Sequence, residues 1–454
     1  LSKAGASEGR LAGSSNALGY VRPASYDAFE GEINRQGRTK VDTDGVSLTA
    51  NWGFDDFTLT SVSSYIRGDY LAQMDVDGSP LRVLEVDWAS STTQWSQDFR
   101  IVGDYEDLNY VVGFYYNKEE MEFENGYDFL MDLEGVVAFD PTLQASGFYV
   151  NQQYEQARES KAVYSQLNYD LSDALTLQFG LRYTEDTNVQ SNFASYAGDY
   201  DRTPLVSLIP GPGAYDATAV LPEESFTDRQ WTGKMGVNYH LKNDTMLFAS
   251  YSQGYRSGGF NGGAFFDESE LTAVEPEFID AYEVGVKSQF FDNRVQVNAS
   301  AFFYDYTNQQ FVNIVGVSPI LVNAGSSEIS GLDLEVLAKP IRNLTVSLGL
   351  GLINSKYNEL KLNPQSGNDA VDLAGNELIS APKMNVNLGL EYLHDLDNLG
   401  TLSAKVDTAF VDDQWLSYVP DPNVLVDYHQ EYLQLLEDTS DYAIGGLSYG
   451  MYHI

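Results

Sequence analysis

Strict alternation of apolar and polar side chains, repeated along most of the chain, is the feature that most constrains its fold. In residues 174–186, ALTLQFGLRYTED, every second side chain from Leu175 to Tyr183 is apolar, and Arg182 belongs to the polar set between them. Successive side chains of a β-strand point to opposite faces, so this segment predicts a strand with one apolar and one polar face. The apolar face then needs a partner.

The alternation recurs in about fifteen segments from about residue 42 onward, and helical periodicity is nearly absent. Residues 293–306, 343–354 and 383–393 are clear examples. A soluble β-sandwich also has half-buried, alternating strands. However, many of these segments run about 10–14 residues, against about 5–6 for an average strand. Their polar faces carry charged side chains, amides and glycines, as expected for a wall in contact with water.

The connections between the segments alternate between short and long. The short ones are rich in Asp, Asn and Gly, which form tight turns at low cost. In an up-and-down sheet this alternation places every short turn on one rim and every long loop on the other, which is typical of outer-membrane barrels. The short connections are 53–56, 103–107, 171–174, 241–244, 291–294, 339–343 and 394–400, and the long ones are about 70–91, 122–159, 188–228, 257–276, 307–324, 357–382 and 413–439.

Aromatic residues at the strand ends indicate two girdles at the lipid headgroups. The apolar face is therefore expected to contact lipid, and the face with Arg182 to line a lumen. The expected girdle residues are Tyr65, Tyr183, Tyr251, Tyr304 and Tyr357 toward the long loops and Tyr169, Tyr239, Phe291 and Tyr392 toward the short turns.

Composition excludes several classes of function. The net charge of −40 argues against nucleic-acid binding, which needs a basic surface. The absence of cysteine excludes disulfides and Cys-ligated zinc sites. There is no apolar run of about 18 residues that would form a transmembrane helix, and the first ten residues lack the apolar core of a signal peptide.

A series of motifs resembles the TonB-dependent outer-membrane receptors. These motifs are LFASYSQGYRSGGFNGG (247–263), the segment 275–311 beginning EPEFIDAYEVGVKSQF, NAGSSEISGLDLEVLAKP (323–340) and DLAGNELISAPKMNVNLGLEY (372–392). The resemblance implies a barrel of about 22 strands with a plugged lumen. It also implies active import of a scarce nutrient, most often a ferric siderophore, with cobalamin, haem and saccharides as other cargoes.

The resemblance also sets the expected domains and partners. We expect residues 1–41 to be irregular or an upstream piece of barrel, and residues 42–454 to be a partial transmembrane β-barrel without the plug and closing strands. About four strands are expected before residue 42 and about three after residue 451, since such barrels have an even strand count. The implied partners are lipid and lipopolysaccharide of the bacterial outer membrane, a TonB-type energy-transducing protein and a ferric chelate. No cofactor is implied.

Four residues near the start of one long loop are the candidate ligand contacts: Tyr255, Arg256, Phe260 and Asn261. An aromatic ring beside a guanidinium suits an anionic, planar chelate. The alternative is that they only shape the loop, which bends at the glycines of residues 258–259. The cations Arg182 and Lys287 are expected to face the lumen and to pair with neighbouring Asp or Glu, or with the plug.

Other motifs give weaker indications. GLSYG (446–450) matches a hydrolase elbow around Ser448, but its context is a strand, and we expect no enzyme. His240 and His394 both lie near short turns and could meet across neighbouring strands, yet a metal site is not expected. DVDG (75–78) does not continue as a calcium loop, and the acidic stretch 117–135 is expected to be a solvated loop, with calcium binding as the alternative. A passive porin or adhesin barrel, and a soluble extracellular glycan-binding β-protein, are the alternative functions.

Overall fold

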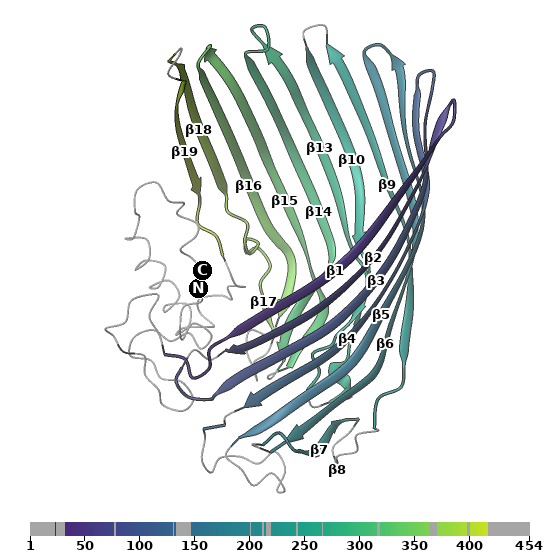
Figure 1. The fold of residues 1–454 in the computed structure, drawn as a ribbon, viewed down its shortest axis with the longest axis vertical. Helices are drawn as coiled ribbons and strands as arrows, with labels where there is room; N and C mark the ends of the chain where they lie inside the picture. Colours follow the sequence, from purple (N-terminus) through teal and green to yellow (C-terminus); the bar gives the residue numbers. More distant parts are fainter. Residues whose placement is uncertain are drawn as a thin grey trace.

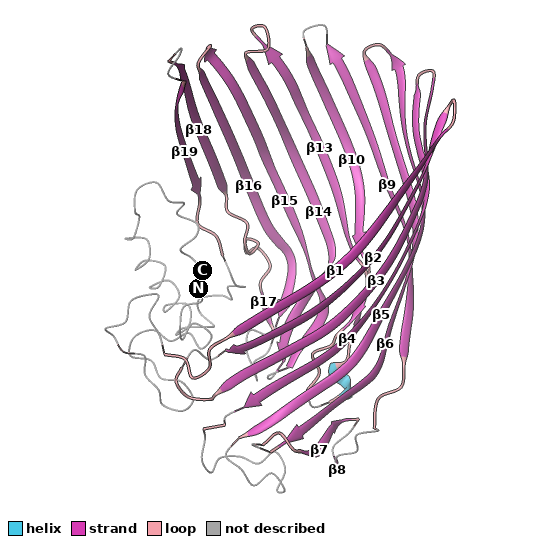
Figure 2. Ribbon diagram, viewed as in Figure 1, coloured by secondary structure: helices cyan, strands magenta, loops and turns pink. Residues whose placement is uncertain are grey.

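The computed structural model describes residue 23 and residues 32–415, except for 77–78, 130, 133–146, 200, 211–212, 215–218, 242–243, 266, 316–317, 363–369 and 397–399. Nearly all of this part is β-strand (Figures 1 and 2), and its helical content is the single 3-10 turn η1 (Glu268–Glu270). Among these residues, no helical segment is suited to spanning a bilayer.

Fourteen long strands follow one another as an antiparallel meander, in which each long strand pairs with the next. The meander curls into a trough with β1 and β19 as its outermost strands (Figure 1). These strands are β1 (Arg38–Gly53), β2 (Phe57–Asp75), β3 (Leu84–Tyr105), β4 (Leu108–Phe129), β5 (Phe148–Ser172), β6 (Leu175–Gly198), β9 (Glu224–Leu241), β10 (Thr245–Arg256), β13 (Glu277–Phe290), β14 (Val295–Val315), β15 (Ser318–Ile341), β16 (Leu344–Leu362), β18 (Met384–Asp395) and β19 (Thr401–Val411).

The all-β, up-and-down architecture is confirmed, with the first strand beginning at Arg38 instead of residue 42. Five short strands lie at one rim, in the connections between long strands. They are β7 (Pro204–Ile209), β8 (Gly213–Ala214), β11 (Gly259–Phe260), β12 (Ala273–Val274) and β17 (Val371–Asp372).

All seven short connections predicted from the sequence join consecutive long strands at one rim. In the turn 291–294, three successive residues adopt the left-handed conformation, with φ of 55° at Phe291, 56° at Asp292 and 61° at Asn293. Asp and Asn tolerate this region better than most residues. The turn chemistry read from the sequence is therefore the chemistry that the fold uses.

The opposite rim differs from the prediction, because the strands extend much further. β5 has 25 residues and β6 has 24. Most of the predicted loop 122–159 is strand, as is nearly all of 307–324. The acidic stretch that begins at residue 117 is likewise the distal part of β4 as far as Phe129, so its assignment as a solvated loop was wrong.

The distal extensions were missed because the polarity of the two faces inverts along each strand. On β4, Phe114 is 43% exposed on the convex face while Tyr115 faces the trough. Beyond Tyr116, the acidic Glu122 and Glu124 occupy the convex positions, and Phe123, Tyr127 and Phe129 pack inward. Such an inversion is expected where a wall leaves an apolar surrounding, because apolar side chains then pack inside the trough and charges face water.

An outer ring of aromatic side chains marks the level of this inversion. Tyr65 pairs with Trp95 across β2 and β3, and the ring centroids of Tyr183 and Trp231 are 4.9 Å apart. Tyr282 continues the ring on β13, at 49% exposure. Nearer the short turns, the expected residues Tyr169, Tyr239, Phe291 and Tyr392 are also exposed, so the two predicted girdles are present.

Two predicted girdle residues lie elsewhere. Tyr357 is only 4% exposed and packs with Phe311 and Leu360 in a cluster at the distal ends of β14 and β16. Tyr304 alternates with the outward Phe303 and stacks on Phe302, at a centroid distance of 4.9 Å, on the concave face. Both assignments came from position along the chain without regard to which face the side chain occupies.

Candidate functional site

The connection between β10 and β13, residues 257–276, crosses the concave face of the sheet, and we call it the crossing segment. At one side Ser195 of β6 donates a hydrogen bond to the carbonyl of Phe265 at 3.0 Å. At the other side Asn261 Nδ2 donates to the carbonyl of Pro319 on β15 at 3.1 Å. Figure 2 shows its 3-10 turn η1 in cyan, near the long-loop ends of the strands. The segment therefore bridges two walls that are far apart along the sheet.

Phe265 anchors the crossing segment. Its side chain is 3% exposed and packs edge-on against Tyr127 of β4, with ring centroids 4.7 Å apart. Two glycines allow the close approach: a Cβ at Gly262 would lie 2.3 Å from the hydroxyl of Tyr154, and one at Gly263 would lie 2.7 Å from Pro319. Larger residues do not fit at these positions without displacing the wall.

Three of the four predicted rim residues make contacts within the fold. Tyr255 donates its hydroxyl to Asp186 of β6. Phe260 lies 5.0 Å from the ring of Phe226. Asn261 is 7% exposed and also donates to the carbonyl of Glu270 at 2.8 Å. These side chains hold the base of the crossing segment against the wall, as in the alternative reading in which they only shape the loop.

Arg256 differs from the other three rim residues because its side chain is 72% exposed. Its ion pair with Glu277 is long, at 3.7 Å. A guanidinium so placed retains most of its donors for an incoming oxyanion. Its role in ligand binding remains a prediction.

Burial changes the acidity of two groups beneath the crossing segment, on the long-loop side of the aromatic ring. Burial, reinforced by Asp186, raises the pKa of Tyr255, so its phenol stays a neutral donor. Burial also raises the pKa of Asp228, although the backbone N–H of Gly258 donates to this carboxylate at 3.1 Å and opposes the shift. Both shifts are what desolvation does to groups that ionise to anions.

Arg182 and Lys287 lie on the concave face of the sheet, and the expected pairing with neighbouring carboxylates is not found. Within the described ranges, neither cation has a carboxylate oxygen within 4.0 Å. The guanidinium of Arg182 lies near the rings of Tyr115 and Tyr164. Lys287 lies 5.7 Å from the ring of Phe248, in a cavity of about 580 Å³ lined also by acidic and amide side chains of β13–β18.

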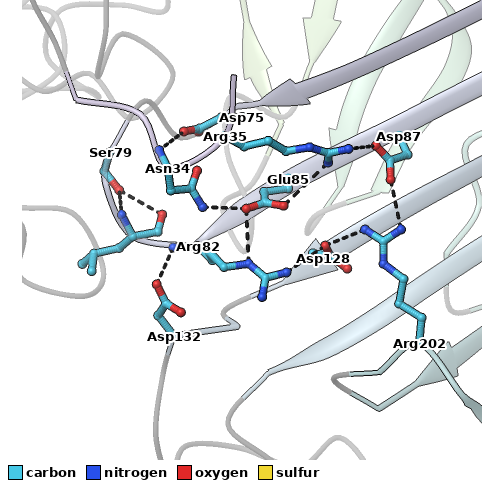
Figure 3. Close-up of polar contacts among 11 residues, drawn as sticks. Asn34, Arg35, Asp75, Ser79, Arg82, Glu85, Asp87, Asp128, Asp132 and Arg202 are labelled. Atoms are coloured by element: carbon cyan, nitrogen blue, oxygen red, sulfur yellow. Dashed lines mark hydrogen bonds and ion pairs between the residues drawn. The ribbon is translucent and has the colours of Figure 1, made fainter. Parts of the chain in front are cut away.

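Sequence reasoning missed a network of three arginines and five carboxylates at the distal ends of β2–β4, which we call the distal charge network (Figure 3). Its members are Arg35, Arg82, Arg202, Glu85, Asp87, Asp128 and Asp132, together with Asp75, which Asn34 links to Glu85. Glu85, Asp87 and Asp128 alternate with apolar residues of β3 and β4 that pack inward. The network thus lies on the face opposite Phe265, where the sequence shows only alternating charge.

Asp128 is the centre of the distal charge network. Its side chain is 1% exposed and accepts Arg202 at 2.8 Å and Arg82 at 3.2 Å. A buried carboxylate is tolerated only with such partners. Arg35 joins through Asp87 at 2.5 Å, so the network connects the segment before β1, the β2–β3 connection and the turn after β6 to one sheet (Figure 3).

The other sequence motifs do not come together in a common site within the described residues. His240 lies on β9 and His394 on β18, which are not adjacent strands, so the idea that they meet was wrong. In the part of the chain that is described, no group of three or more metal-binding side chains converges. The GLSYG motif with Ser448 lies outside the described residues. So do residues 77–78, the last two of the DVDG motif.

Comparison with known proteins identifies the fold family. Residues 4–449 match the family described as TonB dependent receptor-like, beta-barrel. The pesticin receptor of Yersinia enterocolitica is 22% identical over 377 residues, which cover 78% of this chain and 49% of the relative. The chain thus spans about half the length of the curated relatives it matches.

Solved structures agree with this assignment. The ferric yersiniabactin uptake receptor FyuA from Yersinia pestis superposes with a TM-score of 0.64 at 18% identity, covering 84% of this chain and 51% of that one. The siderophore receptor PiuA from Acinetobacter baumannii gives 0.57 at 17% identity, covering 82% and 55%. At these identities the likeness shows the fold, and the family match sets aside a soluble glycan-binding protein. The chain belongs to the TonB-dependent receptor β-barrel family, whose members are outer-membrane proteins.

Proposed function

We propose that this chain serves an outer-membrane receptor that imports a ferric siderophore, or another scarce chelated nutrient, with energy supplied through a TonB-type partner. The observation that carries the proposal is the polar concave wall crossed by residues 257–276, in a chain of this receptor family. Relatives named as a pesticin receptor and a ferric yersiniabactin uptake receptor support the cargo class.

The geometry supports binding and passage instead of chemistry. Polar and charged side chains such as Lys287 line the trough, and its convex face is apolar between the two girdles. The crossing segment narrows the distal half of the lumen, so a ligand entering from that side meets it first. Arg256 at the base of this segment is the exposed cation available to an anionic chelate. The outer aromatic ring and the charged convex positions beyond it suit contacts with lipid and lipopolysaccharide headgroups.

Uptake of radiolabelled ferric chelate into cells that express the protein tests the proposal. Uptake should stop when an uncoupler collapses the membrane potential. Uptake that continues unchanged would favour the alternative, a passive porin. A barrel that neither binds nor imports the chelate would contradict both transport functions and favour an adhesin.

The contribution of Arg256 is tested separately by equilibrium binding. Arg256→Ala should weaken binding of an anionic chelate by about tenfold, the loss expected for one charge-assisted hydrogen bond. The matched control is Arg342→Ala, an exposed arginine at the rim of short turns. Equal affinities of the two variants for the chelate would mean that Arg256 does not contribute to binding.

A further inference from the structure

Arg182 is held in a fixed orientation by neighbours that leave its terminal nitrogens free. Its Cζ lies 5.5 Å from the ring centre of Tyr115 and 5.8 Å from that of Tyr164. Its Nε donates to the hydroxyl of Thr184 at 3.0 Å. An arginine has five N–H donors, and this arrangement uses one of them for an oxygen acceptor.

The wall around Arg182 is built to position Tyr164. Gly113 lies directly opposite Tyr164 in the register of β4 and β5, and a Cβ there would lie 2.4 Å from the tyrosine ring. The missing side chain lets the ring lie across the wall, where its hydroxyl donates to Asp98 at 2.8 Å. Asp98 in turn is paired with Arg100 at 3.0 Å. The carboxylate held by Tyr164 is therefore already paired with Arg100 and does not form an ion pair with Arg182.

Acidic residues outnumber basic ones in this chain by 66 to 26, so carboxylate partners for cations are plentiful. Most cations of the described part have a carboxylate partner, including the exposed Lys405, which pairs with Asp407 at 3.1 Å on the concave face. Arg182 is half-buried on the same face, and the residue two positions further along its own strand is Thr184 instead of an acid. Its guanidinium is instead presented to the lumen.

We propose that Arg182, with Tyr115 and Tyr164, forms a carboxylate-binding site on the lumen wall. A planar carboxylate matches the two terminal nitrogens of a guanidinium in a bidentate pair. The rings limit the rotation of the guanidinium, so less freedom is lost on binding. The carboxylate comes from one of two sources: a dissolved organic anion, or an acidic side chain of polypeptide that fills the lumen.

The test is calorimetric titration of the purified protein in detergent with citrate, together with its thermal unfolding midpoint. The variant is Arg182→Gln, and the matched control is Lys405→Gln, which removes the same charge from the same wall at a site with its own carboxylate. If the source is a dissolved anion, Arg182→Gln should weaken citrate binding by about tenfold. The control should stay within about twofold of the parent protein.

If the source is a side chain within the protein, citrate binding should not change, and Arg182→Gln should lower the unfolding midpoint clearly more than Lys405→Gln does. Behaviour equal to the control in both measurements would overturn the proposal. Gly113→Ala provides an independent check, because it displaces Tyr164 while Arg182 remains. Gly113→Ala should show part of the effect of Arg182→Gln, in whichever of the two measurements that variant changes. The readouts are equilibrium binding and stability, so their failure would leave the proposed import function untouched.

Discussion

Asp128 accepts a hydrogen bond from Arg202 at 2.8 Å, although the two residues are 74 positions apart in the chain. Asp128 belongs to β4, and Arg202 to the turn that follows β6. Its guanidinium also lies 4.8 Å from the ring centre of Tyr149. The pair fixes the turn after β6 onto the distal sheet, and it makes the order of that turn dependent on one buried carboxylate.

Arg202→Gln should loosen the turn after β6. Breaking a buried ion pair costs about 3–5 kcal/mol. Arg202 is partly exposed and Asp128 keeps Arg82, so we expect about 1–3 kcal/mol. Hydrogen exchange of residues 201–209 should rise, while that of β3 should change little. Arg67→Gln is the control, since its pair with Asp69 is exposed and 3.7 Å long. Equal exchange in both variants would contradict a structural role for the distal charge network.

Phe265→Ala should release the crossing segment from the wall. Removing a buried phenylalanine side chain costs about 3–5 kcal/mol. Exchange should therefore accelerate across residues 257–276, with the long strands β10 and β13 still protected. Phe291→Ala is a matched control, because Phe291 is 70% exposed at a short turn. A crossing segment that stays protected in Phe265→Ala would mean that its hydrogen bonds to the wall suffice.

The protection of the crossing segment should depend on pH through Asp228. Burial raises the folded-state pKa of this carboxyl above its ordinary value of about 3.9. Its contribution to stability is complete below that value and is lost as the pH rises through the raised pKa. Asp228→Asn should abolish this loss, so residues 257–264 should be better protected than in the parent at pH 7 and similarly protected at pH 4.

Asp267→Asn provides a control of opposite sign. The hydroxyl and the backbone N–H of Ser269 lower the pKa of Asp267. Its contribution is present above the unfolded pKa and lost as the pH falls through the folded pKa. This substitution should therefore reduce protection at pH 7. A decrease in both variants at pH 7 would show that burial does not govern Asp228.

Arginine substitutions on adjacent residues of β16 should separate the two faces of the wall. Leu348→Arg places a charge on the lipid face and should cost about 2–4 kcal/mol near the middle of the bilayer. Ser347→Arg points into the trough and should cost much less. Folding titrations into lipid vesicles measure both. Equal penalties would contradict a lipid-facing convex surface.

The membrane-level part of the fold was predictable because one local rule operates there. Alternation such as Leu177, Phe179 and Leu181 fixes the lipid face, and Asp- and Asn-rich turns fix one rim. The rule fails beyond the aromatic ring, where apolar residues change face. A further change of face occurs at Asn192, which has a φ of 55° and lies at a register shift between β5 and β6. The next residue, Phe193, is 1% exposed.

The start of the crossing segment was predictable from the sequence, but its path was not. The glycines and aromatics around residues 255–261 correctly indicated where a long connection begins. Whether that connection extends outward or crosses the trough depends on partners far away in sequence, such as Ser195 and Pro319. The distal charge network escaped detection for the same reason. Arg202 and Asp128 are 74 positions apart, and their ion pair can be recognised only when the register of the strands is known.

The inversion of polarity along the strands has a consequence for how such a wall enters its membrane. The distal ends carry charges to the far side of the bilayer, where Asp128 can meet Arg82 and Arg202 only after their strands have crossed. Sliding a strand back would first separate these charges and then draw an uncompensated carboxylate into hydrocarbon, at a cost of several kcal/mol. The distal charge network therefore opposes withdrawal of these strands once they have crossed.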